Sequence, residues 1–242
     1  MTPFDTELLL AAGIVAFYLF DSARLLHVDE LLVESRGRGW RVRLGARLEL
    51  RGRFVWIPNA LLPARTALPA SWLAPAAGEG GDDDPDALRR FARRLWPVRA
   101  GCIAAGALVL VAIPALLLAA HDPVWLLAAL LAALAVTAAM LAVVFAQRAA
   151  LGLDNRTCVA LAAECLLCPP CAPNLYRKLC GLRGFCGDPI AFAARHLPPR
   201  ERARLRHDID ARIALFATAD EDAGGTVADI RRAQARIHEA LA

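Results

Sequence analysis

Two long stretches without charged residues dominate the hydrophobic pattern of this 242-residue chain, at residues 100–120 and 124–146. A membrane-spanning helix needs about 20 apolar residues, because roughly 30 Å of hydrocarbon is crossed at about 1.5 Å per residue. Only residues 121–123 separate the two stretches, so the pattern predicts an antiparallel transmembrane helical hairpin over residues 100–146. Pro114 predicts a kink in the first of its helices.

A third apolar stretch lies near the N-terminus and is shorter. Residues 8–20 carry no charge, and their length is typical of a buried or interfacial segment as much as of a span. Extension to Leu26 gives about 28 Å of helix and includes Asp21 and Arg24, which we expect to pair on one helical face at the membrane boundary. We predict an N-terminal transmembrane helix over residues 1–26. The acidic residues that precede it disfavour a cleaved signal peptide.

Short runs of β-favouring residues broken by glycines fill residues 27–75. Apolar and charged residues alternate within them, as in residues 40–44, and this period gives a strand one apolar face and one basic face. The pattern predicts a small β-rich unit. Its basic face favours anionic lipid headgroups or solvent, and nucleic acid is the less expected partner. We expect strands at residues 31–35, 40–44, 47–51 and 53–58.

An acidic linker and a basic amphipathic helix are predicted over residues 76–99. The aspartates at 82–86 do not have calcium-loop spacing, so we expect a solvated linker, with Asp84 and Pro85 at the start of a helix. Residues 85–96 then place an apolar residue at every third or fourth position among arginines. Such a helix beside a span is typical of the membrane interface, with its apolar face among acyl chains; the alternative is that this face packs on the β-rich unit. The residues expected to contact lipid headgroups are Arg89, Arg90, Arg93, Arg94 and Trp96.

Composition and charge fit a protein that is partly in the membrane and partly in water. Hydrophobic residues make up 57% of the chain and charged residues 21%, whereas soluble domains are about 45–50% apolar. All 28 Lys and Arg lie at residues 24–99 and 148–236. Because positive residues near spans stay cytoplasmic, we expect these two stretches and the C-terminus in the cytoplasm and the N-terminus in the periplasm. The abundance of Arg and Ala is typical of a GC-rich bacterial genome and indicates the bacterial inner membrane.

Six of the seven cysteines lie between residues 158 and 186, in a predicted cytoplasmic segment over residues 147–198. Thiols stay reduced in that compartment, so disulfides are disfavoured. A helix is expected over residues 155–167, and the simplest interpretation is that these cysteines are small buried hydrophobes with no cofactor. The alternative is a zinc ion or an iron–sulfur cluster, because part of the segment has the spacing C-x2-C-x2-C, although the next cysteine comes too late for a ferredoxin motif. The candidate metal ligands are Cys165, Cys168, Cys171, Cys180 and Cys186.

Two amphipathic stripes predict a C-terminal helical hairpin over residues 199–242. The stripes consist of Leu205, Ile209, Ile213 and Phe216 and of Val227, Ile230, Ile237 and Leu241. No catalytic residue is predicted: the pairs His207–Asp208 and His238–Glu239 do not share a helical face, and phosphate-loop, dinucleotide, zinc-protease and hydrolase motifs do not occur. Apart from Cys102, the two longer apolar stretches hold no ionisable side chain, which disfavours transport.

Three groups of residues together resemble a family of uncharacterised proteobacterial multi-pass inner-membrane proteins. The groups are Tyr18-Leu-Phe-Asp21-Ser22, Ile57-Pro-Asn59 with Pro63, and Cys168-Pro-Pro followed by Asn174-Leu and Arg177-Lys178. The resemblance covers about the first 180 residues. It implies a small membrane protein with several spans and no known activity.

The expected fold class is an integral membrane α-helical protein with three spans, a small cytoplasmic β-sheet and a C-terminal helical hairpin. The expected function is that of a non-enzymatic, membrane-anchored interaction or scaffold module. Its expected partners are a bilayer with anionic headgroups and a protein partner or a second copy of the chain. The alternative is a thiol-based metal or redox membrane protein that uses the cysteines at residues 158–186.

Overall fold

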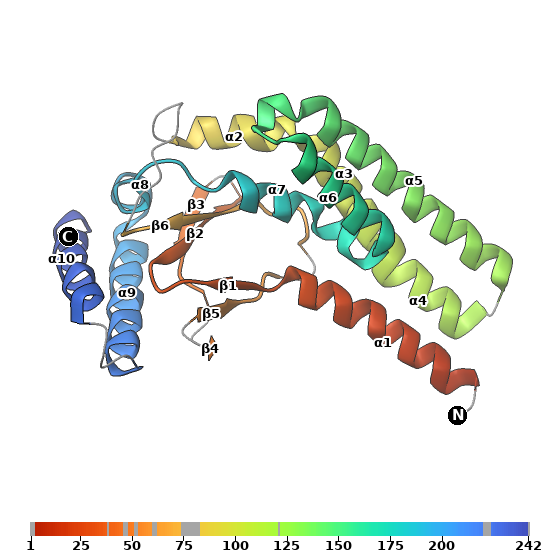
Figure 1. Cartoon of the computed structure of the whole chain (residues 1–242), viewed down its shortest axis with the longest axis horizontal. Coiled ribbons are helices and arrows are strands. Elements are labelled where there is room, and N and C mark those ends of the chain that lie inside the picture. The colour runs from red at the N-terminus through yellow and green to blue at the C-terminus, as the bar shows by residue number, and fades with distance from the viewer. Residues whose placement is uncertain are drawn as a thin grey trace. The chain divides into compact units, whose positions relative to one another are not determined.

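The structure is a computed structural model in which helices predominate (Figure 1). It describes residues 3–37, 39–45, 48–50, 53–59, 62–73, 83–120, 122–219 and 224–241. The chain divides into two compact units, each assembled from three segments. The first unit consists of Met1–Ala23, Pro58–Arg65 and Phe91–Leu179, and the second of Arg24–Ile57, Thr66–Arg90 and Cys180–Ala242.

Helix α1 (Pro3–Ser22) opens the first unit and leaves large apolar side chains such as Leu9, Phe17 and Phe20 exposed. The expected continuation of this helix to Leu26 is wrong. The chain leaves the helix after Ser22 and enters strand β1, whose backbone pairs with another strand instead of continuing the helix. Arg24 therefore does not share a helical face with Asp21, and the expected pair between them does not form.

The predicted hairpin is present in the first unit. Its first arm comprises α3 (Trp96–Ala107), the π-helical segment η1 (Leu108–Ala112), α4 (Ile113–Ala115) and the π-helical segment η2 (Leu116–Ala120). Its second arm is α5 (Pro123–Gln147), which Asp122 caps by accepting a hydrogen bond from the Val124 amide. The two π-helical segments flank Pro114, which has no N–H to donate and was expected to perturb the helix at this point.

The arms of the hairpin are long and apolar enough to cross a membrane. Trp96–Ala119 and Pro123–Gln147 meet this criterion among the described residues, and only 28% and 33% of their most apolar windows are buried. The arms touch closely at Gly101, where an added Cβ would lie 2.3 Å from Cγ of Met140. Glycine permits this approach, as small residues do between membrane helices.

The remainder of the first unit follows the hairpin. It contains η3 (Ala149–Leu151), α6 (Asn155–Leu167), η4 (Pro169–Asn174) and the beginning of α7 (Leu175–Arg183). Helix α6 has the predicted bounds: Asp154 caps its start by accepting from the Thr157 amide, and Pro169 follows its end. Cys158, Leu161 and Cys165 form the buried stripe of this helix.

The second unit holds two three-stranded antiparallel sheets where one small sheet was expected. One sheet has the order β1 (Arg24–Leu26), β5 (Arg53–Trp56), β4 (Glu49–Leu50), and the other has β3 (Gly39–Arg43), β2 (Glu30–Arg36), β6 (Ala67–Ser71). Strands β1 and β6 were not predicted. In the second sheet Val33 of β2 lies opposite both Val42 and Leu68, so the core of the sheet forms around β2.

In the described part of the second unit, four helices join the end of α7. They are α2 (Pro85–Arg94), α8 (Pro189–His196), α9 (Pro199–Ala219) and α10 (Gly224–Ala240). Helices α9 and α10 contact each other and confirm the predicted C-terminal helical hairpin. Leu205, Ile209 and Ile213 of α9 are buried, and so are Ile237 and Leu241. The side chains of Phe216, Val227 and Ile230 lie outside the described part of the chain.

The acidic linker differs from its prediction at its last residues. Residues 74–82 lie outside the description, but Asp83 is buried rather than solvated. Its carboxylate accepts from Nη1 of Arg183 at 3.0 Å and from the Cys186 amide at 2.8 Å. The neighbouring Asp84 accepts from the Ala87 amide and caps α2, as predicted.

Candidate functional site

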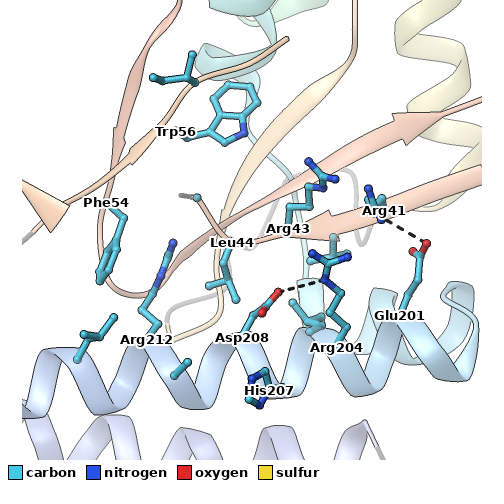
Figure 2. Close-up of a pocket in the computed structure, with 16 residues that line it drawn as sticks. Arg41, Arg43, Leu44, Phe54, Trp56, Glu201, Arg204, His207, Asp208 and Arg212 are labelled. Atoms are coloured by element: carbon cyan, nitrogen blue, oxygen red, sulfur yellow. Dashed lines mark ion pairs between the residues drawn. The ribbon is translucent and has the colours of Figure 1, made fainter. Parts of the chain in front are cut away.

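A cavity of about 810 Å³ lies in the second unit and is lined by side chains of α9, β3, β5 and the residues that follow these strands (Figure 2). This volume is in the range of small-molecule sites, which are roughly 300–1,000 Å³. Phe54, Trp56 and Leu44 give the cavity an apolar surface. The polar lining is mostly basic.

The charged side chains of the cavity do not balance. Four arginines line it against two acids, so the formal charge is +2 with His207 neutral. The two ion pairs are long: Arg41 lies 3.9 Å from Glu201 and Arg204 lies 3.8 Å from Asp208. Burial and the repulsion from neighbouring arginines, with Arg43 the strongest, lower the pKa of Arg41. Among the described residues that line the cavity, arginines therefore outnumber acids by two. The charged residues are Arg41, Arg43, Arg204, Arg212, Glu201 and Asp208.

Arg212 is the most constrained of these cations because it is only 4% exposed. Its Nη1 donates to the carbonyl of Glu30 at 2.8 Å, and its guanidinium lies 4.1 Å from the ring centre of Phe54. Its Nη2 has no hydrogen-bond acceptor among the described residues. Burial lowers the pKa of Arg212 to about 10, so the guanidinium is still protonated at neutral pH. A buried cation with an unpaired donor is costly unless an anion compensates it.

The sequence reasoning did not single out Arg212, although a signal was present. Arg212 falls three residues after Ile209 and one before Ile213, within the apolar stripe of α9. A charged residue on the buried face of an amphipathic helix calls for a partner. The apolar stripe predicts the helix, and the arginine within it indicates in addition a buried cation.

In the first unit, the residues that carry the family resemblance converge on Arg177. Its guanidinium donates to the carbonyls of Asn59 at 2.7 Å and Leu62 at 3.0 Å, to Oδ1 of Asn174 at 2.8 Å and to Oγ of Ser22 at 3.1 Å. Burial lowers the pKa of Arg177. These contacts join α1, the segment after β5 and η4, although Ser22, Asn59 and Leu62 all precede Arg177 by more than 100 positions. Arg177 thus holds three segments of the unit together.

Lys178, the only lysine of the chain, lies beside this cluster and pairs with two carboxylates. Its Nζ is 2.7 Å from Asp21 and 2.6 Å from Glu164. Asp21, Glu164 and Cys171 have potential metal-ligand atoms within 4.8 Å of one another. The ammonium of Lys178 lies within ion-pair distance of both carboxylates and balances one of their two negative charges.

Three of the five predicted cysteine ligands, Cys165, Cys168 and Cys171, lie in the first unit. The sulfurs of Cys168 and Cys171 are 3.1 Å apart, and Cys165 lies on α6 in the same unit. Cys180 and Cys186 belong to the second unit. Burial raises the pKa of Cys165 to about 11 and that of Cys171 further. The five-cysteine site stays a prediction.

The predicted headgroup-contact residues Arg89, Arg90, Arg93, Arg94 and Trp96 are all exposed. The expectation that the apolar face of this helix lies among acyl chains is wrong. Leu88 and Leu95 are fully buried within the protein, and Phe91 packs near the ring of Tyr176. Acyl chains therefore do not cover Leu88 and Leu95, whereas the four arginines and Trp96 are exposed.

The histidines of the two adjacent pairs have different surroundings. His207 lines the basic cavity. Nε2 of His238 is 2.8 Å from Oδ1 of Asp210, and Gln234 donates to the same carboxylate atom at 2.6 Å. These contacts link α10 to α9 in a position that sequence adjacency did not predict.

Comparisons with protein-family models, with curated proteins and with solved structures found no match for this chain. Its function is therefore argued from its own residues.

Proposed function

We propose that the protein is a non-enzymatic, membrane-anchored interaction module. The observation that carries this proposal is the apolar surface of the helical hairpin. The most apolar windows of Trp96–Ala119 and Pro123–Gln147 are only 28% and 33% buried by the rest of the chain. Exposing such a surface to water is unfavourable by about 25 cal/mol per Å², and a bilayer removes that cost.

Two tryptophans support this placement because they mark the ends of the hairpin. Trp96 begins its first arm and is 63% exposed, and Trp125 lies near the start of its second arm and is 65% exposed. Tryptophan is enriched at both membrane–water interfaces. The exposed apolar residues of α1, including Leu9 and Phe20, favour a third span.

The arginines of α2 are proposed to bind anionic headgroups next to the first arm of the hairpin. They are exposed and precede Trp96 directly in the chain. Each basic residue near an anionic membrane surface contributes about 1 kcal/mol. We further propose the inner-membrane orientation given by the charge distribution, with the second unit in the cytoplasm. Its partner there is proposed to be a protein or a second copy of the chain.

Quenching of tryptophan fluorescence by brominated lipid tests the anchoring. The full chain is reconstituted in bilayers of phosphatidylcholine brominated near the headgroup. Trp96→Phe and Trp125→Phe are each expected to remove part of the quenched emission. Trp72→Phe is the matched control, because Trp72 is fully buried, and it is expected to leave the quenched part unchanged. Equal emission from the wild type in brominated and unbrominated bilayers would refute the proposal.

The headgroup contact is tested separately with a variant that carries glutamine at all four arginines of α2. The wild type is expected to unfold at a higher temperature in phosphatidylglycerol nanodiscs than in phosphatidylcholine nanodiscs. This difference should shrink in the variant and persist in Arg156→Gln, whose arginine is exposed on α6. An unchanged difference in the fourfold variant would remove the headgroup assignment.

A further inference from the structure

We infer that the basic cavity of the second unit is a binding site for an organic phosphate ester. The phosphate would interact with the arginines, and the organic part would lie against Phe54, Trp56 and Leu44. All lining residues belong to the second unit. The inference therefore goes beyond membrane anchoring and does not depend on it.

The unpaired donor of Arg212 is the first argument that the cavity takes a ligand. This arginine lines the cavity, is 4% exposed and keeps an Nη2 without an acceptor among the described residues. Buried donors in folded proteins nearly always have a partner. The contacts of Nη1 with Glu30 and of the guanidinium with the Phe54 ring fix the side chain in place. The unpaired donor is thus held in a fixed position in the wall of the cavity, and a bound oxygen atom would supply the acceptor that it lacks.

The sign and size of the charge are the second argument. Arg41 has more cations than anions near it, with Arg43, Arg36 and Arg204 against Glu201, and Figure 2 shows the guanidinium groups of Arg41, Arg43 and Arg204 on the same side of Leu44. The formal excess of +2 in the lining matches the charge of a phosphate monoester, which is about −1.5 to −2 at pH 7. Guanidinium forks also fit phosphate oxygens in a bidentate manner.

The volume of the cavity and its apolar lining both indicate a ligand larger than inorganic phosphate. The cavity of about 810 Å³ is many times the volume of a single water-sized group, which is about 30 Å³. Trp56 supplies the accessible aromatic area on which an organic group gains binding energy, because Phe54 is only 2% exposed. We expect an ester with an apolar or aromatic group to bind more tightly than the free anion.

Calorimetric titration of the full chain tests the site, in a detergent without phosphate. The probes are phenyl phosphate, inorganic phosphate and phenol. Phenyl phosphate is expected to bind at least about tenfold more tightly than inorganic phosphate, because the ring adds apolar contact, and phenol is expected not to bind. Absence of phenyl phosphate binding to the wild type would overturn the inference.

Three variants separate binding from folding. Arg43→Gln changes an exposed residue at the end of β3, and Arg212→Gln changes the buried one; each is expected to weaken phenyl phosphate binding at least about tenfold. Arg200→Gln is the control, since Arg200 is exposed on α9 outside the cavity. If Arg212→Gln fails to fold, Arg43→Gln still decides the question. Equal affinity in Arg43→Gln and Arg200→Gln would overturn the inference.

The phosphate has two possible sources, a soluble ester or a lipid headgroup. The same titration with phenyl phosphate is repeated in nanodiscs of phosphatidylcholine with and without phosphatidic acid. Competition by phosphatidic acid that disappears in Arg43→Gln would assign a lipid phosphate to the cavity. Undiminished phenyl phosphate binding in both nanodiscs would assign a soluble ester.

Discussion

Replacement of Arg177 by alanine is expected to destabilise the first unit more than the removal of any exposed arginine. The guanidinium donates to the carbonyls of Asn59 and Leu62 and to the side chains of Asn174 and Ser22. Asn174 and Ser22 are themselves buried. The substitution removes the donor from all four acceptors at once and leaves a cavity between three chain segments.

The magnitude follows from the acceptors that lose their partner. A buried polar group without a hydrogen bond costs about 1–3 kcal/mol, and the two carbonyls and Asn174 are the three closest acceptors, at 2.7–3.0 Å. Relief of the burial of the Arg177 cation offsets part of this sum. The expected loss is about 3–5 kcal/mol, as for other disrupted buried charge contacts. For a chain of this size the loss corresponds to a decrease in the melting temperature of roughly 6–20 °C.

Thermal unfolding of the full chain in detergent, followed by tryptophan fluorescence, measures this loss. Arg156→Ala is the control because Arg156 is exposed on the neighbouring helix α6, and its effect should stay within about 0.5 kcal/mol. Arg177→Lys keeps the charge but lacks the planar fork, so it should lie between the two. A melting temperature of Arg177→Ala equal to that of Arg156→Ala would refute the structural role of the cluster.

Three further outcomes are expected. Gly101→Ala would bring a Cβ to 2.3 Å from Met140 and should cost about 1–3 kcal/mol; in combination with Met140→Ala the cost should be less than the sum of the single effects, and additive effects would contradict the contact. Burial opposes the charge of Lys178, but hydrogen bonds with its two carboxylate partners raise its pKa overall. The stability difference between the wild type and Lys178→Met should therefore be fully present below the usual lysine pKa of about 10.4 and decrease as the pH rises through the raised value; a difference that stays constant through pH 11 in thermal unfolding would contradict this. Less than one equivalent of metal or acid-labile sulfide in reductively purified protein would remove the metal alternative, and any bound metal should be released by Cys168→Ser if that cysteine is a ligand.

The elements predicted well from the sequence depend on local signals. The hairpin follows from two charge-free runs and a short turn, and its second helix begins at Pro123 after the Asp122 cap. Helix α6 has the predicted bounds because Asp154 starts it and Pro169 follows it. Length, capping and proline each act within a few residues.

The strands that were missed depend on distant partners. Strand β1 follows directly on an apolar helix, and its pairing with β5 joins residues about 30 positions apart. Strand β6 contains Pro69 and has no alternating pattern, yet it pairs with β2 along its whole length. The residues of β1 by themselves continued a helical pattern, and those of β6 by themselves did not indicate a strand.

The burial of individual arginines could not be predicted from composition. The chain has 27 arginines, and a typical arginine is exposed. Arg177 becomes buried because segments from α1 and from the region after β5 meet around it. Two weaker signals in the sequence pointed to these positions. Lys178, which follows Arg177 directly, is the only lysine of the chain, and Arg212 interrupts an apolar stripe.

The two buried arginines also show why ligand binding is assigned to one unit and not to the other. Every described contact of Arg177 ends on an acceptor of the protein, and neither terminal nitrogen lacks a partner among the described residues. Among the described residues the acceptors found for Arg212 are on Nη1, and Nη2 has none; this arginine lines a cavity in which the described arginines outnumber the acids. Folding alone therefore accounts for the position of Arg177. The unpaired donor of Arg212 supports the proposed anion, which would supply the missing acceptor from outside the chain.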